Sequence, residues 1–158
     1  MRKNLLIVSL AACCAIVLSS ALAFAGENWL GTWKLNLAKS KYNPGPGPKS
    51  QTLKFESTQD GIRLTSEGVT SEETATHGGY VSKFDGKDVA WEGNPDADMA
   101  SAKKFDDDSY ENTWKKAGKT TIVSKVVVSK DGRTLMVTQT GTDSKGRAVI
   151  NTSVYDKK

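Results

Sequence analysis

Hydrophobic and polar side chains alternate at every second position through much of this chain. The clearest early run places Trp33 and Leu35 on one side of an extended backbone. Thr32 and Lys34 then point to the other side. Similar runs recur as far as residues 149–155 near the C-terminus. A period of two predicts β-strands that each bury one face.

Turn signals separate these runs at short intervals. Asp-Gly pairs at 60–61, 85–86 and 131–132 favour tight hairpins. Three prolines alternate with two glycines at 44–48, so this segment can enter neither a helix nor a sheet ladder and is expected to form a loop at the rim. No helical period continues over two turns after residue 25. We count about nine or ten strands joined as a meander.

These patterns predict an all-β fold, a single antiparallel up-and-down β-barrel of about eight to ten strands over residues 26–158. A barrel closes when its first and last strands pair, so we expect 29–37 to pair with 149–155. A β-sandwich is the alternative, but its Greek-key crossings usually need longer connections than this chain offers. Parallel βαβ architecture is excluded because crossover helices are missing from the pattern.

Residues 1–25 have the pattern of a signal peptide. Arg2 and Lys3 precede an apolar run at 5–22, and Ala23-Phe24-Ala25 provides the small-x-small site that predicts cleavage after Ala25. The protein is therefore expected outside the cytoplasm, in a periplasm or secreted, with no stable membrane span after cleavage.

Two alternatives for this segment remain open. The apolar run approaches transmembrane length and could be an uncleaved anchor. Leu10-Ala11-Ala12-Cys13 resembles a bacterial lipobox, which would place a lipid on Cys13. A second apolar run follows that cysteine, however, and would remain in the chain after lipidation.

Composition narrows the possible chemistry. Both cysteines, Cys13 and Cys14, lie in the leader, so the remaining chain has neither a disulfide, a thiol nucleophile nor a cysteine zinc site. Removing Arg2 and Lys3 from the 22 basic residues leaves 20 against 18 acidic ones. Because the two signs alternate along the chain, we expect no nucleic-acid partner.

Two short stretches resemble the calycin superfamily of lipocalins and fatty-acid-binding proteins: Gly31-Thr32-Trp33-Lys34-Leu35 and Val154-Tyr155-Asp156-Lys157. The chain is also similar to short exported bacterial lipocalin-like proteins. The resemblance implies a β-barrel with an interior that can hold a ligand.

The sequence departs from fatty-acid-binding proteins at two places. Residues 38–49 are too short and too rich in proline for the helix-turn-helix lid of that family. Ser153 stands where the family carries the arginine that grips the ligand carboxylate. The resemblance therefore does not imply a carboxylate clamp or a fatty-acid ligand.

Inward-facing aromatic and polar side chains are the candidate ligand contacts, because apolar walls with a few polar groups are typical of small-molecule pockets. The candidates are Tyr80, Ser82, Phe84, Trp91, Tyr110, Asn112, Trp114, Ser124 and Gln139. The alternative is a filled barrel whose polar groups bond to one another. Trp33 is expected to pack across the closed end as a structural residue.

Neither a metal site nor a catalytic group is indicated. An EF-type loop counted from Asn94 would have Met99 and Phe105 where glycine and glutamate are required, which leaves only an irregular calcium site as an alternative. His77 is the single histidine and lacks an accompanying nucleophile motif, so we interpret it as a surface residue. We expect no enzyme activity, no cofactor and no metal.

The leading interpretation is a monomeric, exported binding protein that takes a small, mostly apolar ligand between the loops at 44–48 and 94–98. Asn112, Ser124 or Gln139 would orient a polar group of the ligand. The alternative is a protein-interaction module, such as an inhibitor or an envelope accessory protein, with a filled core and working loops. A cavity of several hundred Å³ would favour the first interpretation.

The leader can be tested directly by the intact mass of the protein isolated from outside the cytoplasm. Cleavage after Ala25 leaves Gly26 as the first residue. A mass that includes a lipid on Cys13, or the complete chain, would instead support one of the two alternatives.

Overall fold

The computed structural model describes residues 28–158, so the expected signal peptide, 1–25, lies outside the described residues. Ten strands follow one another along the chain, with a short 3-10 turn, η1, after the first. They are β1 (Gly31–Leu35), η1 (Leu37–Lys39), β2 (Ser50–Thr58), β3 (Gly61–Val69), β4 (Ala75–Ser82), β5 (Asp85–Ala90), β6 (Met99–Lys104), β7 (Ser109–Lys116), β8 (Lys119–Val128), β9 (Thr134–Thr142) and β10 (Ala148–Lys157).

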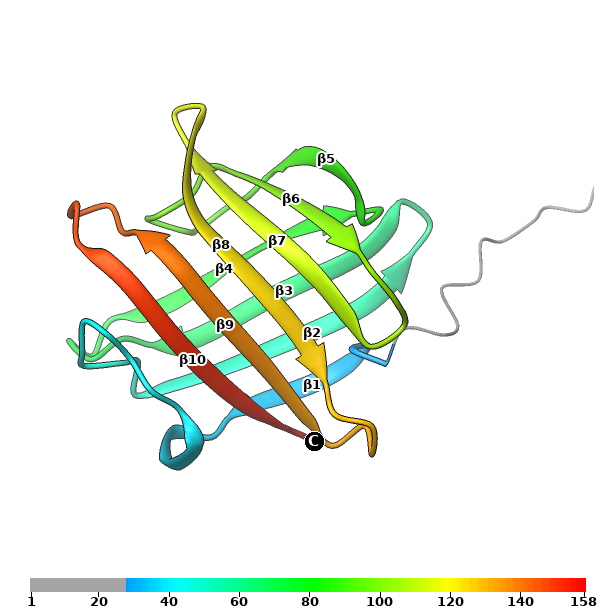
Figure 1. The fold of residues 1–158 in the computed structure, drawn as a ribbon, viewed down its shortest axis with the longest axis horizontal. Helices are drawn as coiled ribbons and strands as arrows, with labels where there is room; N and C mark the ends of the chain where they lie inside the picture. Colours follow the sequence, from blue (N-terminus) through cyan, green and yellow to red (C-terminus); the bar gives the residue numbers. More distant parts are fainter. Residues whose placement is uncertain (1–27) are drawn as a thin grey trace, which may run out of the picture.

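The strands form one antiparallel sheet that curves into a barrel (Figure 1). Neighbours in sequence are neighbours in the sheet, except that β4 and β5 are its two end strands. In addition, β1 pairs with β10. The all-β up-and-down barrel expected from the sequence is thus confirmed. Within the described part of the chain, no helix is both long and apolar enough to cross a membrane.

The first and last strands pair as predicted, but β1 is shorter than expected and the paired residues are 33–35 and 155–157 instead of a ladder along 149–155. Leu35 lies opposite Tyr155, and Trp33 lies opposite Lys157. The strand ends there because Asn36 caps η1, where its side chain accepts a hydrogen bond from the Lys39 amide. The chain then returns to β10 through a bridge between Lys41 and Thr152.

A narrow seam between β4 and the segment after β5 completes the barrel. Gly79 and Glu92 exchange two backbone hydrogen bonds of 3.1 and 3.2 Å. A Cβ atom on Gly78 would lie 2.4 Å from the Glu92 carbonyl oxygen, and one on Gly93 (φ +73°) would lie 2.0 Å from that of His77. Glycine therefore allows the two backbones to approach closely enough to bond.

One predicted turn is displaced. The Asp85-Gly86 pair was expected to turn the chain, but β5 already begins at Asp85 and the turn lies just before it. Phe84 adopts φ +57°, and its amide donates to Ser82 Oγ at 3.0 Å. This conformation lets the Phe84 ring enter the core, where its centroid lies 4.8 Å from that of Tyr110.

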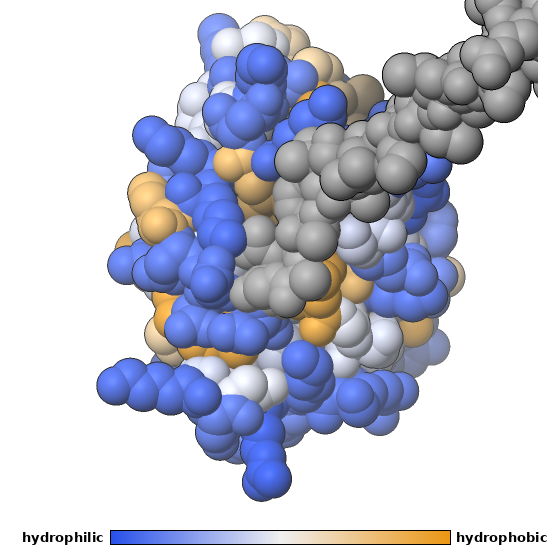
Figure 2. Space-filling view, turned by 90° about the vertical axis from the view of Figure 1, so that its right-hand side faces the viewer, coloured by the Kyte–Doolittle hydropathy of each residue, from blue (hydrophilic) through white to orange (hydrophobic). Residues whose placement is uncertain are grey.

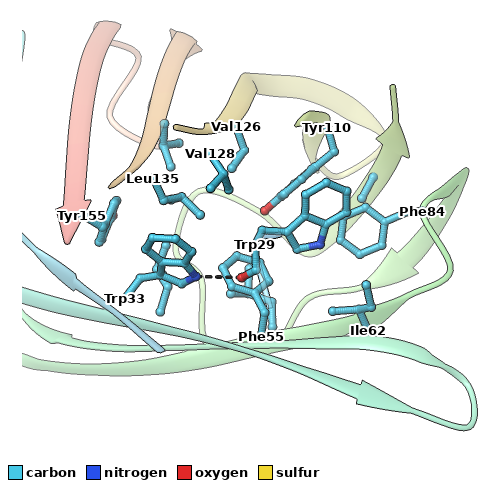
Figure 3. Close-up of a cluster of buried hydrophobic side chains, with 14 of the residues drawn as sticks. Trp29, Trp33, Phe55, Ile62, Phe84, Tyr110, Val126, Val128, Leu135 and Tyr155 are labelled. Carbon is cyan, nitrogen blue, oxygen red and sulfur yellow. Dashed lines mark hydrogen bonds between the residues drawn. The ribbon is translucent and has the colours of Figure 1, made fainter. Parts of the chain in front are cut away.

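The core fills one end of the barrel with aromatic side chains. Trp29 and Trp33 are both fully buried, and the Trp33 indole donates to the Trp29 carbonyl oxygen at 2.7 Å (Figure 3). Phe84 and Tyr110 pack against Trp29, and Phe55 packs against Tyr110. Trp33 thus has the structural place expected of it. On the side seen in Figure 2, hydrophilic side chains predominate and hydrophobic ones form separate small areas.

Replacing Trp33 with phenylalanine tests the contribution of this core. The substitution removes buried ring atoms and leaves the Trp29 carbonyl without its donor, so we expect a loss of about 2–4 kcal/mol in the free energy of unfolding. Urea denaturation measures the loss. Ile150→Ala, at a 60% exposed position, is the control and should change stability by less than about 0.5 kcal/mol. Equal effects of the two substitutions would contradict the proposed role of Trp33.

Gly78→Ala tests the seam, because the added methyl group would collide with the Glu92 carbonyl. We expect faster hydrogen exchange at the amides of Gly79 and Glu92, which bond across the seam. Gly118→Ala is the control, since a Cβ at Gly118 meets no atom within 4 Å and the strain of alanine at its φ of +76° falls in the turn between β7 and β8, away from the seam. Unchanged protection of both amides in Gly78→Ala would show that the seam tolerates a side chain.

Candidate functional site

A cavity of about 340 Å³ occupies the half of the barrel away from the aromatic core. Its mouth lies between the 44–48 segment, cyan in Figure 1, and the loop at 93–96. Inward-facing side chains of β2, β3 and β7–β10 form the walls. The volume lies at the lower end of the range of about 300–1,000 Å³ that is usual for small-molecule sites.

The first loop at the mouth is fastened to β10. The Ile150 amide donates to the Asn43 carbonyl at 2.7 Å. The Asn43 amide donates to Asn151 Oδ1 at 3.0 Å. Ser153 Oγ and the Tyr42 hydroxyl bond at 3.0 Å, which draws Tyr42 into the cavity wall. These contacts fix where the proline segment crosses the rim.

The second loop is fastened to the opposite rim. Asp96 accepts a hydrogen bond from the Ser144 amide at 2.7 Å, and its own amide donates to Asn94 Oδ1 at 2.9 Å. Thr121 Oγ1 donates to the Asp96 carbonyl at 2.8 Å. Both sides of the mouth are thus held by hydrogen bonds, and the opening is preformed.

Apolar and phenolic side chains form the floor. Phe55, Val126 and Val137 meet Tyr110 and Tyr155 at the boundary with the core. Burial raises the pKa of both phenols above its ordinary value, so both stay neutral near pH 7. The Tyr155 hydroxyl also donates to Gln51 Oε1 at 2.6 Å.

A row of polar side chains crosses one wall at a single level. Asn112 lies opposite Ser124, Ser124 lies opposite Gln139, and Gln139 lies opposite Asn151. Gln139 Nε2 donates to Ser124 Oγ across 3.5 Å, which is long for such a bond. On the facing wall, Gln51 Nε2 donates to Ser66 Oγ at 3.0 Å.

Unpaired polar atoms concentrate beside the cavity. Over residues 28–158, four buried side-chain atoms lack a hydrogen-bond partner: Trp29 Nε1, Tyr80 Oη, Asn112 Oδ1 and Trp114 Nε1. Asn112 and Trp114 line the cavity, and Tyr80 packs edge-on against the lining Trp91 with ring centroids 5.0 Å apart. Buried polar groups are normally paired, but the unpaired atoms of Asn112 and Trp114 are themselves buried rather than open to the cavity.

The cavity lining has little charge. Its residues include neither lysine nor arginine, and besides neutral phenols its ionisable groups are His77 and Asp96 at the mouth. His77 is well exposed, and its Nδ1 lies 3.3 Å from Glu67 Oε1. The expectation of a surface histidine is therefore met, although its ring stands at the rim of a cavity.

Six of the nine candidate contacts line the cavity: Trp91, Tyr110, Asn112, Trp114, Ser124 and Gln139. The other three, Tyr80, Ser82 and Phe84, are buried and are not among the residues that line it. The alternation of polar and apolar residues predicts which side chains of a strand point inward. It does not predict how far along the barrel axis the interior is completely filled. A ligand-binding role for the six lining residues stays a prediction.

Sequence reasoning missed several polar lining residues. Gln51 and Ser66 continue the inward faces of β2 and β3 beyond Leu53 and Leu64, so the same period of two could have located them. Tyr42 gave no such signal, because it lies in an irregular segment and reaches the wall through its bond to Ser153.

The loop at 94–98, considered for calcium, and the acidic segment at 106–108 lie at different ends of the barrel. Asp96 lies at the mouth of the cavity. The backbone carbonyl of Asp107 instead accepts a hydrogen bond from the backbone amide of Asn28, beside the aromatic core. The Asp98 carboxylate accepts a hydrogen bond from the Ala117 amide at 2.9 Å. Over residues 28–158, no group of three metal-ligating side chains gathers at either place.

No protein-family profile and no curated protein matches this sequence. Among solved structures, the chain is similar to the crystal structure of zebrafish ileal bile acid-binding protein complexed with cholic acid, with a TM-score of 0.48 and 9% sequence identity. The alignment covers 84% of this chain and 100% of that chain. We therefore base the function proposed below on this chain's own residues.

Proposed function

We propose that this protein is an exported, non-enzymatic binding protein that holds a small, mostly apolar molecule inside its barrel. The cavity of about 340 Å³ is the observation that carries this proposal. Export rests on the leader at 1–25, and the kinship with short bacterial lipocalin-like proteins rests on the two terminal stretches.

Burial of apolar ligand surface would supply the affinity. Aromatic rings line one side of the cavity, where Trp91 and Trp114 pack edge-on with centroids 4.8 Å apart, and Phe55 with Val126 forms part of the floor. Each Å² of apolar surface removed from water contributes about 25 cal/mol before the costs of ordering. Because hydrogen bonds hold both loops of the mouth, binding need not order either loop.

The cavity also weighs against the alternative of a filled barrel that acts only through its loops. That alternative expects interior side chains to occupy the whole barrel. Here the cavity stays open because small side chains such as Ser124 and Ser66 stand among its lining residues. The loops would then serve as the entrance to the site.

A pair of adjacent substitutions on β8 tests the proposal. Ser124 faces the cavity and Val123 faces outward, so Ser124→Phe fills the cavity while Val123→Phe adds the same ring to the outer surface. We expect the uncharged fluorescent probe N-phenylnaphthylamine to bind the wild type and Val123→Phe. Its affinity for Ser124→Phe should fall about tenfold or more, because the ring takes up the space that the probe needs.

Probe binding that is undetectable in the wild type, or equally weakened in both variants, would defeat the proposal and favour the loop-based alternative. Native mass spectrometry of the wild-type protein purified from its own host would identify a ligand that stays bound during purification.

A further inference from the structure

A second, smaller pocket adjoins the mouth of the cavity. It measures about 200 Å³ and lies beside the turn between β9 and β10, which is orange in Figure 1. Five residues line both this side pocket and the cavity: Pro44, Asp96, Trp114, Gln139 and Asn151. A ligand whose apolar body lies in the cavity can therefore place one end against this border.

The positive charge of the side pocket is already balanced by the protein. Arg147 Nε donates to Asp143 Oδ2 at 2.7 Å, and Arg147 Nη2 lies 2.7 Å from the same oxygen. The Arg147 and Lys145 amides donate to Asp143 Oδ1 at 2.9 and 3.0 Å. Hydrogen bonds, first that from the Arg147 amide, hold the pKa of Asp143 below its ordinary value, so this carboxylate stays charged near pH 7. An anionic ligand would have to compete with Asp143 for the guanidinium group.

Asp96, at the border, has no comparable partner. The side chain accepts the Ser144 amide at Oδ1, and within residues 28–158 its Oδ2 has neither a hydrogen-bond donor nor a cation. A half-buried carboxylate with one neutral donor has lost part of its hydration without replacement, which favours a cation beside it. The other charged lining group, His77, is exposed and lies 3.3 Å from Glu67. The uncompensated charge at the mouth is therefore negative.

The neutral groups at the border also suit a cation. Gln139 Oε1 has no hydrogen-bond partner within the described chain, so its carbonyl oxygen can accept from a ligand. An ammonium group has several donors and can use this oxygen together with a carboxylate. Trp114 and Trp91 both line the cavity, and indole rings attract cations to their faces.

We propose that the ligand is an apolar amine. Its hydrocarbon body lies in the cavity, and its protonated nitrogen donates to Asp96 at the border with the side pocket. A carboxylate on the same hydrocarbon body binds weakly, because Asp96 repels it and Asp143 already occupies Arg147. This inference rests on the proposed binding function and names the chemical class of its ligand.

Three probes with one alkyl chain test this selection by competition with N-phenylnaphthylamine. At pH 7 decylamine is a cation, decan-1-ol is neutral and decanoate is an anion. We expect decylamine to bind about fivefold more tightly than decan-1-ol, as one charge-assisted hydrogen bond allows. Decanoate should bind at least about tenfold more weakly than decylamine.

Asp96→Asn assigns the charge to its residue. Asparagine keeps an oxygen for the Ser144 amide but removes the negative charge, so the affinity for decylamine should fall about fivefold while that for decan-1-ol stays unchanged. Asp60→Asn is the matched control, because it removes the same charge at the exposed turn between β2 and β3. It should leave all three affinities unchanged. Urea denaturation confirms that each variant is folded.

The outcomes separate the two proposals. Decanoate that binds as tightly as decylamine, or three probes that all fail to displace N-phenylnaphthylamine, would overturn the inference while the proposed function stands. An Asp96→Asn variant that weakens decylamine and decan-1-ol equally, or neither, would also overturn it. If N-phenylnaphthylamine itself does not bind to the wild type, the proposed function fails.

Discussion

The pairing of β1 with β10 is the contact on which the barrel depends. β1 has only five residues, yet it joins β2 to β10 and so converts a ten-stranded meander into a closed wall. Without this contact, β1 and β10 would both present unpaired backbone groups to solvent. The same strand carries Trp33, whose indole bonds to the Trp29 carbonyl and anchors the aromatic core at the same place. Closure and core formation are therefore coupled through one short strand.

The closed end and the cavity are two consequences of where large side chains lie along the strands. The rings of Trp29, Phe84 and Tyr110 pack against one another and fill the barrel at their level. Further along β7 and β8 the inward positions become Asn112 and Ser124, which are too small to reach across the barrel. Trp114 follows Asn112 on the same face and forms part of the cavity wall, and the remaining space opens between the two hydrogen-bonded loops.

The polarity of the cavity gives this space its chemical character. A fully apolar interior would accept any apolar molecule of suitable size, and a buried arginine would favour an anion. This barrel instead carries a row of neutral amides and hydroxyls between apolar levels, together with unpaired atoms on Asn112 and Trp114. Neutral polar groups such as those of Gln51, Ser124 and Gln139 thus line a preformed site whose charged side chains lie at the mouth.

The sequence by itself determined the all-β meander, nearly every turn and the pairing of the two terminal strands, because a period of two and Asp-Gly or Pro-Gly signals are local properties. It also determined which side chains face inward. Only the tertiary structure decided the depth of each inward residue, since depth depends on register around the whole barrel. Tyr80, Ser82 and Phe84 consequently proved to lie among packed neighbours, whereas Gln51 and Tyr42 reached the cavity wall. The glycine seam and the displaced turn at Phe84 likewise arise from contacts between distant segments that no local pattern encodes.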